Sequence, residues 1–132
     1  MSSNSERQAK AQLESIIEMV KAVEDASGVD EGDQEEAREA ALQTIYEDPL
    51  EVAVRSGWVS CREAMVPKEY MILLCTGGPA VRIVGDLDGW GQPESATLFH
   101  QDWGTPWIEY LVDRDQEDAL ISYARNFYFG EG

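Results

Sequence analysis

The sequence is poor in the residues that most often carry chemistry. It has two cysteines, Cys61 and Cys75, and one histidine, His100, among 132 residues. The cysteines match no metal-binding or redox spacing, and one histidine with scattered carboxylates offers no recognised ligand set for a metal ion. The pair Gly77-Gly78 lacks the longer glycine pattern and the lysine of a phosphate-binding loop. We therefore expect no cofactor and no metal centre.

Long apolar runs are missing as well. No stretch reaches the roughly 20 apolar residues that a membrane-spanning helix needs. The N-terminal sequence MSSNSERQAK has no apolar core of the kind found in secretion signals. The sequence therefore predicts a cytoplasmic protein without a membrane partner.

Positive charge is scarce. Ten lysines and arginines stand against 26 aspartates and glutamates, which gives a formal net charge of −16. A surface of this sign repels nucleic acid and anionic membrane and attracts basic partners. The acids are spread over the whole chain, so they do not form a simple acidic tail. Like charges at this density destabilise the compact state, and solubility alone does not require so many.

Apolar runs broken by glycine and proline mark the centre of the chain, Glu69–Tyr110. Tyr70–Thr76 and Ala80–Leu87 are rich in β-branched and large apolar residues, and the Gly-Gly-Pro between them is typical of a hairpin turn. A second glycine-rich turn leads into Ser95–Trp103, which predicts a three-strand antiparallel meander. Leu50–Val59 begins with alternating apolar and polar residues, so we expect it to join the sheet as a fourth strand.

Apolar residues at the spacing of a helix are found toward both ends of the chain. A first helix is expected over Glu6–Ala26, where Ser5–Gln8 (SERQ) has the form of a capping box. A second helix is expected over Gln34–Glu47, ended by Pro49, and a last helix starts at Asp115. Small residues at the start of the second helix favour its close packing on the first as an antiparallel hairpin.

These elements predict a single α+β domain. Residues 1–48 are expected to form an acidic helical hairpin, and residues 49–132 an antiparallel four-strand sheet with the C-terminal helix packed on it. Gly104 and Pro106 interrupt the chain after the meander, and Trp107–Val112 is expected to resume an extended course.

Four segments resemble parts of small uncharacterised proteins carried on bacterial plasmids, integrative elements and phages. These segments are EDPLEVAVRSGW (Glu47–Trp58), YMILLCTGGPAVRIVGDL (Tyr70–Leu87), QDWGTPW (Gln101–Trp107) and YARNFYFGE (Tyr123–Glu131). The resemblance implies a mobile genetic element as context and implies no activity. Small acidic proteins of such elements are often anti-CRISPR or anti-restriction inhibitors, and some are DNA mimics, which is an association by class and not by motif.

Charge and resemblance together favour a non-enzymatic inhibitor or adaptor that binds the basic, nucleic-acid-binding surface of a host defence complex. Its carboxylates would stand in for phosphates, as in a DNA mimic, so no direct binding to nucleic acid is expected. Trp90, in the glycine-rich turn after Leu87, is expected to be exposed, and aromatic residues are enriched at protein interfaces. The candidate partner-binding residues lie on the second helix and near the ends of the meander: Glu35, Glu36, Glu39, Glu47, Asp48, Asp86, Asp88, Trp90, Asp102 and Trp103.

Alternatives stay open. Cys75, His100 and Asp102 supply the residue types of a thiol nucleophile, a base and an orienting acid, and alternation places His100 and Asp102 on the same strand face. No cysteine-protease signature surrounds Cys75, however, and a cysteine within a strand is expected to be inert. The acids could instead form only a solvated surface, with an unknown protein partner bound elsewhere. A homodimer is also left open.

Overall fold

The computed structural model describes residues 4–26 and 31–129 and confirms the α+β class. The described residues form three helices, α1 (Asn4–Ala26), α2 (Glu31–Glu47) and α3 (Arg114–Ala124). They also form five strands, β1 (Glu51–Ser56), β2 (Pro67–Cys75), β3 (Ala80–Asp86), β4 (Thr97–Gln101) and β5 (Ile108–Tyr110). The sheet has one strand more than the four predicted, because Ile108–Tyr110 pairs with β4 in antiparallel register.

The sheet is an antiparallel meander. Its strand order is β1-β2-β3-β4-β5, and each strand pairs antiparallel with its neighbours in sequence. The turn between β2 and β3 lies at the predicted hairpin, where Gly77 and Gly78 have φ of 101° and 154°. Residues with a side chain rarely adopt such values, so the glycines determine where this hairpin closes. β1 ends at Ser56 rather than Val59, and β4 is shorter than the predicted strand at both ends.

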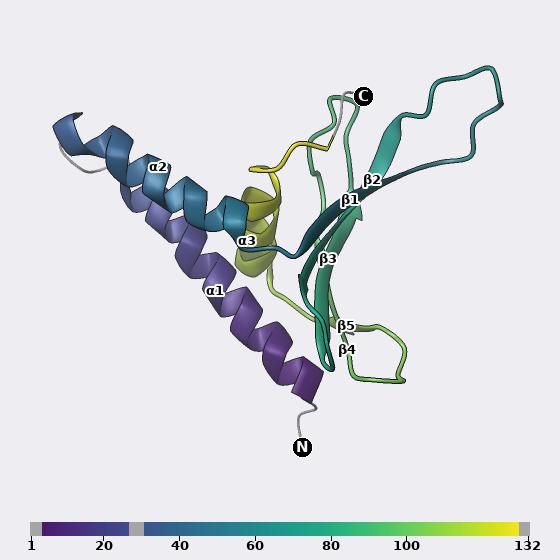
Figure 1. The fold of residues 1–132 in the computed structure, drawn as a ribbon, viewed down its shortest axis with the longest axis horizontal. Helices are drawn as coiled ribbons and strands as arrows, with labels where there is room; N and C mark the ends of the chain where they lie inside the picture. The colour runs from purple at the N-terminus through teal and green to yellow at the C-terminus, as the bar shows by residue number, and fades with distance from the viewer. Residues whose placement is uncertain (1–3, 27–30, 130–132) are drawn as a thin grey trace.

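Within the described residues, all three helices lie on one side of the sheet (Figure 1). Alternate residues of β2 and β3 point toward this helical layer, and Tyr70, Ile72 and Ile83 among them are buried. They belong to one apolar cluster with Leu13 and Ile16 of α1. The intervening residues of the same two strands point to the opposite face, and most of them stay partly exposed. The protein therefore has two layers, and one face of its sheet is open.

Helix α1, rather than α2, covers the sheet. It packs on β3 and β4, whereas α2 packs along α1 and extends past the sheet (Figure 1). Of the α2 side chains that the structure describes, Ile45 is the buried one. The predicted helical hairpin is thus present over its described part, and the surface of α2 faces mostly solvent.

Helix α3 begins at Arg114, one residue before the predicted start at Asp115. Asp113 is its N-cap, and its carboxylate accepts a hydrogen bond from the Gln116 N–H at 2.8 Å. The Gln116 side chain accepts one from the Asp113 N–H at 2.9 Å, which completes a capping box. The cap therefore lies two residues before the predicted first helical residue.

Three aromatic contacts and one hydrogen bond fix α3 and the residues after it. Leu120 and Tyr123 are buried, and the Tyr123 hydroxyl donates a hydrogen bond to the Asp48 carboxylate at 2.7 Å. Just past the helix, Phe129 is buried against Tyr70 of β2, with 5.0 Å between ring centroids. Tyr123 and Tyr46 also pack edge-on to Phe127. The C-terminal segment therefore joins both layers.

Candidate partner-binding surfaces

The open face of the sheet carries an apolar patch with an arginine at its centre. One row of Cα partners crosses this face from β1 to β5: Glu51, Leu73, Arg82, Phe99 and Glu109. The next row holds Ala53, Met71, Val84 and Thr97. We call these two rows, together with Trp107, the open-face patch.

Arg82 stacks on aromatic rings and has no carboxylate partner among the described residues. Its guanidinium carbon lies 4.1 Å from the centroid of the Trp107 ring and 5.8 Å from that of Phe99. Its Nε is buried and has no hydrogen-bond partner in the described part of the chain. Burial lowers the pKa of Arg82, and the positive charge of Arg55 lowers it further. An arginine nevertheless stays protonated at neutral pH, so the patch holds an unneutralised cation.

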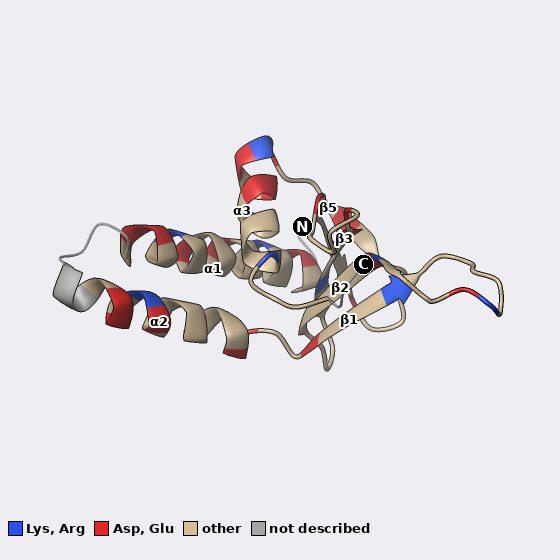
Figure 2. Ribbon diagram, turned by 90° about the horizontal axis from the view of Figure 1, so that it is seen from above, with Lys and Arg blue, Asp and Glu red and all other residues tan. Residues whose placement is uncertain are grey.

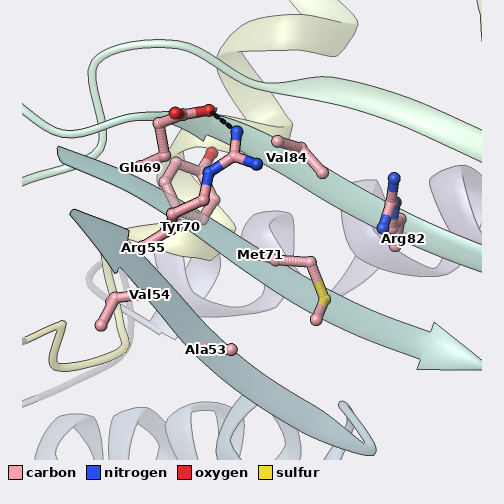
Figure 3. Close-up of a pocket in the computed structure, with 8 residues that line it drawn as sticks. All are labelled: Ala53, Val54, Arg55, Glu69, Tyr70, Met71, Arg82 and Val84. Atoms are coloured by element: carbon pink, nitrogen blue, oxygen red, sulfur yellow. Dashed lines mark hydrogen bonds and ion pairs between the residues drawn. The ribbon is translucent and has the colours of Figure 1, made fainter. Parts of the chain in front are cut away.

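A shallow hollow of about 250 Å³ lies beside Arg82 over β1, β2 and β3 (Figure 3). Met71 and Val84 contribute apolar side chains to it. At one end, Arg55 and Glu69 form an ion pair with an N–O distance of 2.6 Å, and Arg82 lies at the other end. Exposed ion pairs contribute little to stability. The hollow therefore has an apolar floor between a paired arginine and an unpaired one.

Acidic residues occur along all three helices, as the red segments of the ribbon in Figure 2 show. On α2, Glu35, Glu36 and Glu39 are exposed, and none of them forms an ion pair or side-chain hydrogen bond with a described residue. The same holds for Glu14 and Glu18 on α1. The negative charge of the helical layer is therefore left uncompensated at these positions.

The ten predicted partner-binding residues lie in three separate places. The first group, on α2 and just after it, is Glu35, Glu36, Glu39, Glu47 and Asp48; the second, at the end of β3 and in the following turn, is Asp86, Asp88 and Trp90; the third, just after β4, is Asp102 and Trp103. Because β3 and β4 are antiparallel, the second and third groups lie at opposite ends of the sheet. The structure does not bring the ten residues together into one site.

Three of these acids hold the fold together, and one of them, Asp102, is described below with Ser5. Asp48 accepts the hydrogen bond from Tyr123 described above. The Asp88 carboxylate accepts hydrogen bonds from the backbone N–H groups of Trp90 and Gln92, at 2.8 and 3.0 Å, and so closes the turn after β3. The three glutamates at the start of α2 have no such role among the described residues.

Both tryptophans of the predicted set are exposed, as is a third. The exposed fractions of Trp90 and Trp103 are 87% and 90%, and Trp58 in the loop between β1 and β2 is fully exposed. Met65 in the same loop is also exposed. Large aromatic side chains are enriched at protein interfaces, so these positions suit contacts with a protein partner.

Ser5, His100 and Asp102 form a hydrogen-bonded cluster that joins the first turn of α1 to the end of β4. The Ser5 Oγ lies 2.8 Å from both His100 Nδ1 and Asp102 Oδ2, and the Ser5 N–H donates to Asp102 Oδ1 at 3.0 Å. An ionised carboxylate only accepts, so the Ser5 hydroxyl donates to Asp102 and accepts from His100. A serine nucleophile instead gives its proton to histidine. Since Ser5 is also fully buried, the cluster anchors α1 to the sheet.

The capping-box prediction placed Ser5 immediately before the first helix. The helix instead begins at Asn4, and the Ser5 hydroxyl faces the sheet. The prediction that His100 and Asp102 share a face is confirmed, because both side chains contact Ser5.

Cys75 and His100 are not neighbours. Both are Cα partners of Val81, one on each side, so two strand spacings of about 4.8 Å each separate their backbones. Val81 is fully buried between the two strands. The structure therefore does not bring the predicted thiol and base into hydrogen-bonding contact.

Cys75 is expected to react slowly with a mild alkylating reagent, because burial raises the pKa of its thiol. The exposed Cys61 is an internal control in the same chain. In the native protein we expect Cys75 to be alkylated about tenfold more slowly than Cys61, and in denaturant at a similar rate. Mass spectrometry of the labelled peptides measures both. Rapid labelling of Cys75 in the native state would instead support an activated thiol.

Sequence reasoning missed Arg82 and Trp107. A signal for Arg82 was present, since alternation along the strand puts it on the face opposite Val81 and Ile83. The aromatic rings around Arg82 could not be predicted from the sequence. The register of β4 and the path of the loop after it decide which rings reach the guanidinium.

The fold and these surfaces define a two-layer α+β protein with one open sheet face. Comparison with protein-family models, curated proteins and solved structures gave no match. None of the described helices is both long and apolar enough to cross a membrane. Within residues 4–26 and 31–129, no group of three or more His, Cys, Asp or Glu side chains is suited to holding a metal ion.

Proposed function

We propose that the protein is a non-enzymatic inhibitor or adaptor whose acidic helical layer binds the basic surface of a nucleic-acid-binding protein. The observation that carries this proposal is the start of α2, where Glu35, Glu36 and Glu39 are exposed and unpaired among the described residues. Because α2 buries Ile45 alone among its described side chains, the packing of the fold does not depend on these carboxylates.

Charge supplies the physical basis of binding. A net charge of −16 attracts a basic partner over long range and raises the rate of encounter. Like charges one helical turn apart, such as Glu35 and Glu39, repel each other and destabilise the helix slightly. A basic partner relieves this repulsion on binding, so the carboxylates are more favourable in the complex than in the free protein.

The narrower identity of the partner, a host defence complex, is proposed from the resemblance to proteins of mobile genetic elements. The resembling segments lie on the sheet, in its loops and at the C-terminal end, and α2 contributes only Glu47 to them. The acidic surface and the mobile-element context are therefore two independent supports for the proposal.

Replacing Glu35, Glu36 and Glu39 by lysine is expected to slow association with the partner about tenfold or more and to flatten its salt dependence. The fold should persist, because all three side chains are exposed. The partner is captured from host lysate at about 0.1 M salt with the parent protein, then purified. Stopped-flow mixing over a range of salt concentrations gives the association rate, since salt shortens the Debye length from about 10 Å at 0.1 M to about 3 Å at 1 M.

A matched control reverses Glu63, Glu94 and Asp118, which are exposed and lie outside α2. It changes the net charge by the same amount, so it separates the effect of position from that of total charge. Duplex DNA should compete with the parent protein for the captured partner. Equal slowing by both triple variants, or binding that DNA does not affect, would contradict a phosphate-mimicking surface on α2.

A further inference from the structure

The open-face patch presents a partly solvent-accessible apolar surface around a cation. Met71, Leu73 and Val84 are only partly buried, although they lie on β2 and β3, two inner strands of the sheet whose other face the helices cover. Arg82 lies among them on β3, the central strand. In a chain with 26 acids, this guanidinium still has no carboxylate partner among the described residues.

The nearest acids in the same row form no ion pair with Arg82. Glu51 and Glu109 each lie two strands away from it, about 10 Å along the row. Glu69 is paired with Arg55. The Trp107 ring stacks on the guanidinium plane and leaves its N–H edges as the donors that a ligand can use.

The geometry of Arg82 suits a carboxylate. A guanidinium presents a planar set of N–H donors that matches the two oxygens of a carboxylate, and charged hydrogen bonds of this kind are the strong ones. Because Nε is buried, the terminal N–H groups of the guanidinium are the donors that such a carboxylate would use. Phosphates of a nucleic acid fit less well, because the surrounding side chains are apolar and the net charge of −16 repels nucleic acid.

A second copy of the chain is a poor occupant. A two-fold axis through the patch pairs it with itself, so each residue near the axis meets its own counterpart. Arg82 is central in the patch, and the two guanidinium groups would meet with no free acid within one strand spacing. Charge complementarity therefore favours a different protein.

We propose that the open-face patch binds a segment of a partner protein that places an Asp or Glu carboxylate on Arg82 and apolar side chains over Met71, Leu73 and Val84. This interface lies on the layer opposite the acidic helices and is independent of the function proposed above. It would let the protein hold one partner on the sheet while its helices face another.

A charge-swap selection tests this interface. A library of random nine-residue peptides displayed on phage is selected against the parent protein and against Arg82→Glu. Parent selections are expected to enrich peptides with an Asp or Glu flanked by apolar residues, and Arg82→Glu selections to enrich Lys or Arg at that position. For an enriched parent peptide, Arg82→Gln is expected to weaken binding about 10- to 100-fold. This neutral variant also serves if Arg82→Glu does not fold.

Arg55→Gln is the matched control, because Arg55 lies at the rim of the same hollow and is already paired. It and the triple α2 variant are expected to keep the acidic preference of the parent. The proposal is overturned if no peptide is enriched, if the peptides lack an acid, or if Arg82→Glu selects the same peptides. Sedimentation showing a dimer that Arg82→Glu dissociates would also overturn it, in favour of a second copy.

Discussion

Gly85→Ala is expected to destabilise the protein by about 3 kcal/mol and to lower its melting temperature by about 10 °C. A Cβ at Gly85 would fall well inside contact distance of the Ser95 carbonyl oxygen and 2.7 Å from Cε1 of Tyr70. The first of these atoms is backbone and the second belongs to a fully buried ring, so neither moves cheaply. The Tyr70 hydroxyl also donates a hydrogen bond to the Ser95 carbonyl oxygen at 2.7 Å, and a shift of Ser95 breaks it.

Thermal and urea unfolding measure this effect. Gly89→Ala is the control, because a Cβ at Gly89 meets no atom within 4 Å. We expect the control to change the free energy of unfolding by less than about 0.5 kcal/mol. If the two variants unfold alike, β3 and the segment around Ser95 do not approach as closely as the structure places them.

Asp102→Ala is expected to cost about 2–3 kcal/mol of stability, because it removes the acceptor for the backbone N–H and the hydroxyl of Ser5. Ser5 is fully buried, so water cannot replace the lost partner without opening the packing of α1 on β4. The variant also removes a negative charge from the positive N-terminal end of α1. Hydrogen exchange should therefore become faster at the first turn of α1, ahead of global unfolding.

A double-mutant cycle separates the pair from the individual residues. Ser5→Ala combined with Asp102→Ala is expected to cost less than the sum of the two single variants, because each single variant already loses the hydrogen bond from Ser5 Oγ to Asp102 Oδ2. Asp118→Ala is the control, since Asp118 is exposed on α3. Additive effects in the cycle would show that Ser5 and Asp102 do not act as a unit.

The acidic helices and the open-face patch lie on opposite layers, so their roles are separable by mutation. The triple α2 variant changes the charged layer and leaves Arg82 in place, and Arg82→Gln does the reverse. If the protein is an adaptor, each variant should affect one partner only. A loss of both partners from either variant would indicate a single interface.

The sequence predicted those hairpins and helices whose signal comes from residues close together in the chain. The turn between β2 and β3 uses positive φ, which glycine adopts without a steric penalty, so the glycine pair made this hairpin visible in the sequence. The runs of β-branched and large apolar residues likewise predicted that β2 and β3 are strands. β5 was harder, because three residues carry too little pattern to show that Ile108–Tyr110 pairs with β4.

Candidate sites were predicted less well than the elements that carry them. The exposure of Glu35, Glu36 and Glu39 follows from their place on a polar helix surface, and the structure agrees. Asp48 and Asp102 have the same residue type but bind Tyr123 and Ser5, which lie 75 and 97 residues away along the chain. Composition cannot distinguish a free carboxylate from one that is bound within the fold.

The sequence by itself determined the α+β class, the net charge of −16 and the turns that join antiparallel strands. Each of these depends on composition or on residues close together in the chain. Only the tertiary structure decided that all described helices share one face, and that Arg82 therefore lies on an open surface against Trp107. The physical reason is that these features depend on strand register and on which layer each element joins. Both are set by the packing of the whole core around Tyr70, Ile83 and Leu13, which no single segment encodes.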